Sequence, residues 1–145
     1  MPLFASLLSI NTQHETSFDT YVQESSPTTN YHSQSTLKAN NLISRGGNQV
    51  QRIILAFDLS DLSNRTITSA TLTMKTQSGF GFGTSAVPMN IYKLTTPSIV
   101  FDEVTWNQSR NASSSAFNGG DGAFDAGTTA VINGSTGVNV VCTSA

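Results

Sequence analysis

Short segments that favour β-strands, separated by residues that favour turns, constrain the fold of this chain more than any other feature of its sequence. The clearest is Val50–Leu59, where apolar residues recur at every second position, as expected because side chains alternate between the two faces of a strand. We expect its inner face to consist of Ile53, Leu55, Phe57 and Leu59. Residues 67–75 alternate in the same way, with three apolar residues facing inward: Ala70, Leu72 and Met74. Further strands are predicted at Thr20–Val22 (preceded by Phe18), Ser35–Ala39, Val87–Leu94, Val104–Trp106, Val131–Ile132 and Val138–Val141.

The segments between these strands are rich in turn residues. We expect a loop at Ser25–Asn30, a hairpin turn at Arg45–Asn48, a turn or single helical turn at Ser60–Arg65 and a long surface loop at Gln108–Gly127. Ser, Thr, Asn and Gln make up 58 of the 145 residues, and Ser, Thr and Asn disfavour helix interiors. The pattern predicts an all-β protein, an antiparallel β-sandwich or jelly roll. Residues 1–17 would form an N-terminal arm and residues 18–145 a single β-sandwich domain.

Charge and length exclude several classes of protein. The chain has 7 Lys and Arg against 9 Asp and Glu, a net charge of −2, whereas a nucleic-acid-binding protein needs a basic patch. No apolar run approaches the roughly 18–20 residues of a membrane-spanning helix. The single cysteine, Cys142, cannot form an internal disulfide and is interpreted as a small strand residue. Ser6 and Ser9 interrupt the apolar N-terminal stretch, which also lacks a positive charge, so we interpret it as mature sequence rather than a signal peptide.

No pattern of residues indicates catalysis. Asp102 and Glu103 are adjacent, and in a strand their side chains would point to opposite faces, so the pair could not flank a glycosidic bond. His14 and His32 lack the spacing of metal ligands, and no Ser lies in a nucleophile motif. We therefore expect neither an enzyme nor a cofactor. A structural calcium ion at Gly119–Asp125 is the weaker alternative, since this segment has only two carboxylates.

Four segments, in matching order, resemble the DNRLRE domain, a β-sandwich family related to carbohydrate-binding modules of the alginate-binding type. Their sequences are DTYVQESSPTTNY at 19–31, RIILAFDLS at 52–60, ITSATLT at 67–73 and VTWN at 104–107. The resemblance covers roughly residues 18 to 107. It implies a non-catalytic module of the kind found in secreted polysaccharide-active enzymes, in bacterial surface proteins and in phage virion proteins.

Our first hypothesis is a phage virion protein that decorates the capsid or the tail surface and contacts other virion subunits. It rests on the absent signal peptide, the low charge and a missing match to the family's closing strands, because an incomplete sheet edge recruits partners. We expect a homo-oligomer, for which a trimer is a common form. The candidate subunit contacts are apolar residues of the arm and of a Gly-rich loop: Phe4, Leu7, Leu8, Phe80 and Phe82.

The alternative hypothesis is a carbohydrate-binding module for an acidic polysaccharide, at a cell surface or in a secreted enzyme system. Aromatic rings stack on sugars, and the candidate platforms are Trp106, Tyr21, Tyr31 and Tyr92, with Trp106 more readily interpreted as core. Arg side chains pair with carboxylates through two parallel hydrogen bonds. The candidate glycan contacts are therefore Tyr31, Asn30, Arg52 and Arg65.

Overall fold

The computed structural model describes residues 18–44, 47–62, 70–75, 87–92, 94, 99–110, 117, 119, 129–132 and 139–144. The chain divides into two compact units. Unit 1 comprises residues 1–63 and 96–121, and unit 2 comprises residues 64–95 and 122–145. The described residues are rich in strands that pair in antiparallel fashion, and they include a short 3₁₀ turn, η1 (Ser60–Leu62). The prediction of an all-β, antiparallel protein is confirmed at this level. The predicted arm, residues 1–17, lies outside the described residues.

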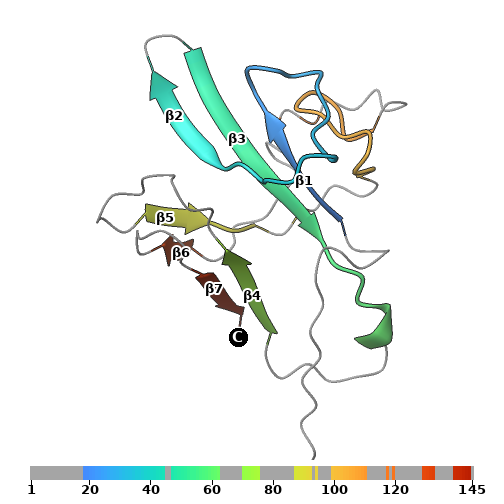
Figure 1. Ribbon diagram of the computed structural model, residues 1–145, viewed down its shortest axis with the longest axis vertical. Coiled ribbons are helices and arrows are strands. Elements are labelled where there is room, and N and C mark those ends of the chain that lie inside the picture. The colour runs from blue at the N-terminus through green and yellow to red at the C-terminus, as the bar shows by residue number, and fades with distance from the viewer. Residues whose placement is uncertain are drawn as a thin grey trace, which may run out of the picture. The chain divides into compact units, whose positions relative to one another are not determined.

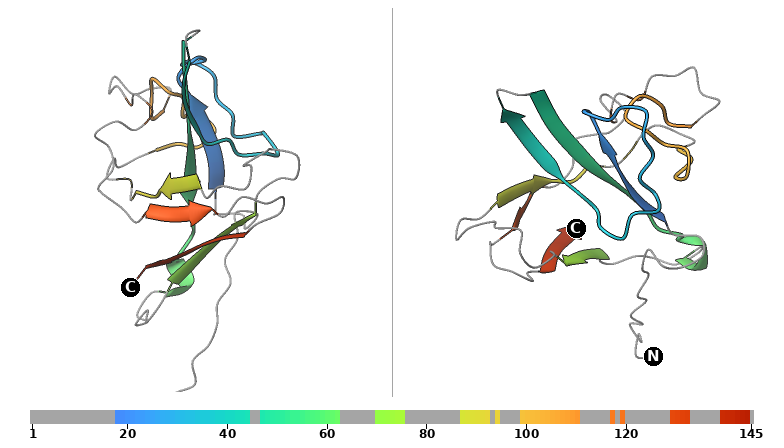
Figure 2. Two further views of the ribbon diagram at one scale, coloured as in Figure 1. Left: turned by 90° about the vertical axis from the view of Figure 1, so that its left-hand side faces the viewer. Right: turned by 45° about the horizontal axis from the view of Figure 1, so that its top comes forward.

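Unit 1 contains a three-stranded antiparallel sheet with the order β1-β3-β2, in which the long strand β3 lies between its neighbours (Figures 1 and 2). Its strands are β1 (Phe18–Gln23), β2 (Asn40–Ser44) and β3 (Gly47–Ala56). Strands β2 and β3 form a hairpin in which Ser44 pairs with Gly47. This pairing confirms the predicted hairpin, whose two connecting residues, 45 and 46, lie outside the described residues.

Both faces of β1 are covered. Three consecutive residues, Thr20, Tyr21 and Val22, are all buried, although adjacent side chains point to opposite faces. On one face the ring of Tyr21 stacks on that of Tyr31, with 4.3 Å between centroids. On the other, Val22 lies beside its cross-strand partner Arg52, and residues 99–110, 117 and 119 supply the side chains and backbone that cover this face.

The core of unit 1 lies mainly between this second face and the described residues of 99–119, with Tyr21 buried on the first face. Its buried apolar residues come from β1, from β3 and from the segment itself, and they are Tyr21, Val22, Ile54, Val104, Trp106 and Phe117. The predicted inner face of β3 is therefore wrong. Ile54 is the buried residue, β3 ends at Ala56, and Leu59 is 56% exposed. The physical reason is that Trp106 and Gly119 pack against the face that carries Arg52 and Ile54.

Two other strand predictions in unit 1 are wrong. Residues 35–39 form no strand, and Lys38 places its ammonium 5.7 Å from the centre of the Tyr21 ring, so this segment crosses the sheet instead of pairing at its edge. Residues Val104–Trp106 are buried, but they do not form a β-strand. Its backbone bonds locally, since the N–H of Val104 donates to the carbonyl of Val100 and that of Thr105 to the carbonyl of Gln108.

The segment 108–127 is not simply a surface loop. Ser109 and Phe117 are 5% and 2% exposed, and Gly119 is buried. The N–H of Phe117 donates to the carbonyl of Asn107, and that of Gly119 to the carbonyl of Trp106. These bonds hold the described part of the segment against the buried Trp106. The other residues of the segment after 110 lie outside the described part of the chain.

Unit 2 consists of two antiparallel strand pairs, as far as it is described. Strand β4 (Ala70–Lys75) pairs with β7 (Asn139–Ser144), and β5 (Val87–Asn90) pairs with β6 (Thr129–Ile132). These pairs confirm four of the predicted strand segments, with shifted ends. Cys142 lies within β7, opposite Leu72, which confirms its predicted strand position.

Candidate functional site

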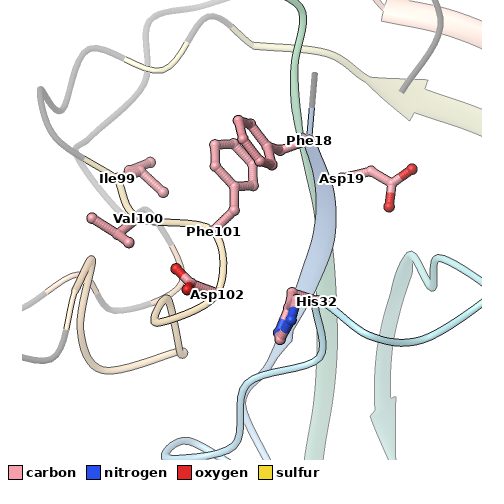
Figure 3. A pocket seen from close by; sticks show the side chains of 7 residues that line it. All are labelled: Phe18, Asp19, His32, Ile99, Val100, Phe101 and Asp102. Atoms are coloured by element: carbon pink, nitrogen blue, oxygen red, sulfur yellow. The ribbon is translucent and has the colours of Figure 1, made fainter. Parts of the chain in front are cut away.

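The described residues of unit 1 line an open pocket of about 550 Å³ (Figure 3). This volume lies within the roughly 300–1,000 Å³ typical of small-molecule sites. The start of β1 forms one wall of the pocket and residues 99–102 form another. His32, from the loop after β1, completes the lining of the pocket. The lining residues are Phe18, Asp19, His32, Ile99, Val100, Phe101 and Asp102.

A pair of stacked aromatic rings forms the apolar part of the pocket. The rings of Phe18 and Phe101 lie 5.4 Å apart between centroids and are inclined by 19°, and Figure 3 shows them face to face. The Phe18 side chain is 47% exposed, and that of Phe101 is half-buried. An exposed large apolar side chain at a pocket indicates a surface that contacts a ligand or partner. The Phe18 ring is thus available to a molecule that enters the pocket.

Asn30 holds the Phe101 wall in place. Its side-chain amide donates to the carbonyl oxygens of Phe101 (3.0 Å) and Val104 (2.7 Å). Its Oδ1 accepts a hydrogen bond from the backbone N–H of His32 (3.0 Å) and lies 2.7 Å from the ring Nδ1. Because Oδ1 is an acceptor, Nδ1 carries the hydrogen in this contact. One asparagine side chain therefore connects two walls of the pocket.

The polar lining of the pocket consists of Asp19, His32 and Asp102. Asp102 and His32 are exposed, and Asp19 is half-buried. In Figure 3 the Asp19 carboxylate lies on the other side of β1 from the two rings, as expected for the neighbour of Phe18 in a strand. Neither Lys nor Arg is among the described residues that line the pocket.

A second cluster surrounds Trp106, which is 9% exposed. The guanidinium of Arg52 lies 5.1 Å from the centre of the indole ring and donates to the carbonyl of Gly119 at 2.8 Å. Gly119 has φ +65°, and a Cβ built there would lie 2.5 to 2.6 Å from the indole. Trp106 is therefore a core residue, as the sequence indicated, and Arg52 is held against it.

The structure separates the four predicted glycan contacts. Asn30 and Tyr31 precede the pocket residue His32, but the ring of Tyr31 stacks on Tyr21 and the side chain of Asn30 bonds within the protein. Arg52 belongs to the Trp106 cluster. Arg65 lies outside the described residues, as do the predicted subunit contacts Phe4, Leu7, Leu8, Phe80 and Phe82.

Sequence reasoning missed the residues that line the pocket. In the sequence Phe18 only precedes the predicted strand Thr20–Val22, and no spacing links it to Phe101 far along the chain. Asp102 and Glu103 lie in a turn rather than a strand, so the predicted placement on opposite faces does not apply. Asp102 is exposed at the pocket, whereas Glu103 is half-buried and does not line it.

No three His, Cys, Asp or Glu side chains among the described residues gather where they could hold a metal ion. No helix within the same residues has the length and apolar character needed to cross a membrane.

A strand-rich chain with an open pocket and an exposed aromatic ring has the features of a ligand-binding module. The model of carbohydrate-binding module family 96 matches residues 11–119. The chain belongs to this family, whose members are non-catalytic binding modules. The match spans most of the chain and includes every residue that lines the pocket. The chain matches no curated protein and no solved structure at a significant level.

Proposed function

We propose that this protein is a non-catalytic carbohydrate-binding module that binds a polysaccharide at the Phe18–Phe101 pocket. The observation that carries the proposal is the exposed Phe18 ring, stacked on Phe101 at a pocket inside the region matched by the family. The C–H groups of a sugar ring pack against the electron-rich face of an aromatic side chain. The carboxylate of Asp102 and the imidazole of His32 offer hydrogen-bond partners to sugar hydroxyls.

The arrangement of carboxylates supports binding without hydrolysis. Glycoside hydrolysis needs two carboxyl groups about 5–10 Å apart on either side of the scissile bond. Of the two acids at this pocket, Asp19 directs its carboxylate to the other side of β1 (Figure 3). Of these two acids, Asp102 alone lies on the same side of β1 as the stacked rings.

The proposal follows the alternative hypothesis from the sequence, because family membership favours a carbohydrate-binding module. We further propose that the strand pairs belong to one β-sandwich and that the protein acts at a cell surface or outside the cell. The virion hypothesis, with its subunit contacts and oligomer, stays a prediction without support from these findings. The acidic ligand and the contacts Tyr31, Arg52 and Arg65 likewise stay predictions, and we assign Asn30 the role of holding the pocket.

Phe18→Ala tests the proposal. Affinity electrophoresis in gels that contain a series of neutral and acidic polysaccharides would identify the ligand of the unchanged protein. We expect Phe18→Ala to weaken binding at least tenfold, as for an aromatic contact worth roughly 1–2 kcal/mol or more. The matched control is Leu59→Ala, which removes an apolar side chain of unit 1 that is 56% exposed and does not line the pocket.

Two results would contradict the proposal. The first is that the folded protein binds none of the polysaccharides. The second is that Phe18→Ala, folded as judged by circular dichroism, binds as tightly as Leu59→Ala, which would place the binding site elsewhere.

A further inference from the structure

We propose that His32 makes ligand binding at the Phe18–Phe101 pocket depend on pH. Its neutral ring presents Nε2 as a hydrogen-bond acceptor for a sugar hydroxyl, and its charged ring presents Nε2–H as a donor to a sugar carboxylate. This inference rests on the proposed function and assigns one contact of that site to one ring atom. The relationship that carries it is the hydrogen-bonded pair of Asn30 and His32.

Backbone groups fix the orientation of the Asn30 amide. Its Nδ2 lies 3.0 Å from the carbonyl oxygen of Phe101 and 2.7 Å from that of Val104. Carbonyl oxygens only accept hydrogen bonds, so the group that faces them is the NH₂. The backbone N–H of His32 only donates, and it lies 3.0 Å from Oδ1. If the amide were turned over, oxygen would face oxygen and N–H would face N–H, so one orientation is possible.

That orientation fixes the tautomer of the His32 ring. Nδ1 lies 2.7 Å from the Asn30 Oδ1, which only accepts, so Nδ1 carries a hydrogen. A neutral imidazole has one N–H, and Nε2 is therefore a bare acceptor. The opposite tautomer would bring the lone pair of Nδ1 against those of Oδ1. Asn30 thus makes two hydrogen bonds as a donor and two as an acceptor, which is its full capacity.

Nε2 is the ring nitrogen through which His32 can meet a ligand. The side chain is exposed and lines the pocket (Figure 3). Its Nδ1 is engaged with Asn30, which also holds the Phe101 wall. The position of the ring is therefore set before a ligand arrives, and such preorganisation lowers the entropy cost of a contact.

The charge of the ring decides which ligand group it can pair with. Histidine side chains change charge between about pH 5 and 8. A sugar hydroxyl both donates and accepts, so it can pair with Nε2 in either state. A carboxylate only accepts, so it pairs with Nε2 only when the ring is protonated, in a charge-assisted bond roughly twice as strong as a neutral one. We therefore expect pH to change the binding of polyuronates and to leave neutral chains nearly unaffected.

The other charged groups near His32 do not supply this positive charge. Asp19 and Asp102 also line the pocket, with Asp102 on the side of the stacked rings. Glu103, the next residue, and Lys38, on the same loop as His32, do not line it. Among the described lining residues, His32 is thus the group that can become a cation.

The tautomer can be measured without a ligand. A long-range ¹H–¹⁵N correlation spectrum of the labelled full chain distinguishes protonated from unprotonated ring nitrogens. The sequence contains two histidines, so His14→Gln assigns the signals. At about pH 7.5 we expect Nδ1 of His32 to carry the hydrogen and Nε2 to carry none. The opposite tautomer, or an exchanging mixture like that of free histidine, would overturn the inference whatever the protein binds.

Binding is measured by isothermal titration calorimetry of the full chain at about pH 5.5 and 7.5. The probes are alginate, polygalacturonate and their carboxyl-reduced counterparts, which keep the linkages but replace each carboxylate by a hydroxymethyl group. We expect a polyuronate to bind about fivefold more tightly at the lower pH, the equivalent of roughly 1 kcal/mol between unit charges in water. The reduced chains should differ by less than about twofold.

Variants identify the residue responsible. His32→Gln places an amide that does not titrate near the position of Nε2. His32→Asn keeps a donor near the position of Nδ1 for Asn30 and lacks Nε2. Both variants should lose the pH dependence, whereas the control variants His14→Gln and Asp102→Asn should retain it.

The outcomes separate the inference from the proposed function. Polyuronate binding whose pH dependence persists in His32→Gln, or is absent from the unchanged protein, would overturn the inference and leave the proposed function standing. Binding of reduced chains alone, at both pH values, would do the same. Failure of the folded protein to bind any member of either panel would overturn both.

Discussion

Asn30 donates a hydrogen bond of 3.0 Å from its side-chain amide to the carbonyl oxygen of Phe101, 71 residues further along the chain. Phe101 in turn stacks on Phe18, so this bond sets the position of one ring of the pocket. A second bond from the same amide reaches the carbonyl of the buried Val104. The loop after β1 and the turn that forms the far wall of the pocket are therefore connected through one side chain.

Asn30→Ala is expected to lower both stability and affinity. Two part-buried carbonyls would lose their donor, which costs about 1–3 kcal/mol of unfolding free energy for a group left unsatisfied. Release of the 101–104 turn should also weaken polysaccharide binding severalfold at temperatures where the protein stays folded. Urea denaturation and calorimetric titration measure the two effects. Asn107→Ala, at an exposed asparagine of the same unit, is the control, and equal stability of the two variants would disprove the role of Asn30.

Gly119→Ala is expected to destabilise unit 1. The backbone at this position has φ +65°, which costs an ordinary L-residue about 1–2 kcal/mol, and its new Cβ would meet the indole of Trp106. Gly119→Asn separates the two causes, because asparagine tolerates positive φ but also carries a Cβ. Thermal denaturation should show similar losses for both variants if the contact with Trp106 dominates. An unchanged melting temperature for Gly119→Ala would show that the described approach of Gly119 to Trp106 is wrong.

Arg52→Lys is expected to destabilise the protein without a selective loss of ligand affinity. Lysine keeps the charge but lacks the planar guanidinium that lies over Trp106 while donating to the Gly119 carbonyl. We expect a loss of about 1–2 kcal/mol of unfolding free energy, a typical cost of one charged hydrogen bond with its stacking contact. Arg110→Lys, at an exposed site, is the stability control.

Ligand affinity decides between two roles for Arg52. If it supports the core, the folded Arg52→Lys protein should bind polysaccharide within about twofold of the unchanged chain. A loss of tenfold or more in a protein of normal stability would instead restore Arg52 as a glycan contact, as the sequence first predicted.

Local sequence patterns predicted those elements whose stability depends on local geometry. The start of the sheet at β1, the β2–β3 hairpin and the turn η1 all follow from alternation or turn residues within a few positions. The patterns failed at Val104–Trp106, which has the β-branched and aromatic composition of a strand. Its backbone instead bonds to carbonyls of Val100 and Gln108 in local turns, while its side chains are buried against the sheet.

The pocket could not be predicted in the same way. Asn30 and Tyr31 were selected because they lie on a loop, and that loop does border the pocket through His32. The side chains of both are nevertheless engaged within the protein. Phe18 looked like an ordinary strand residue, because the exposure of its ring depends on how the 99–102 turn packs beside it.

By itself, the sequence determined that this chain builds antiparallel strands rather than helices, a property that depends on side-chain alternation and turn chemistry within short stretches of chain. Its motifs resembled a family related to carbohydrate-binding modules, but a virion protein was the first hypothesis and the carbohydrate-binding module, which family membership favours, was the alternative. Only the tertiary structure decided which aromatic rings face a ligand and which carboxylate stands beside them. The face of the sheet that carries Phe18 and Arg52 is covered by a segment from the other end of unit 1. Contacts between residues so far apart in the chain leave no periodic signal in the sequence.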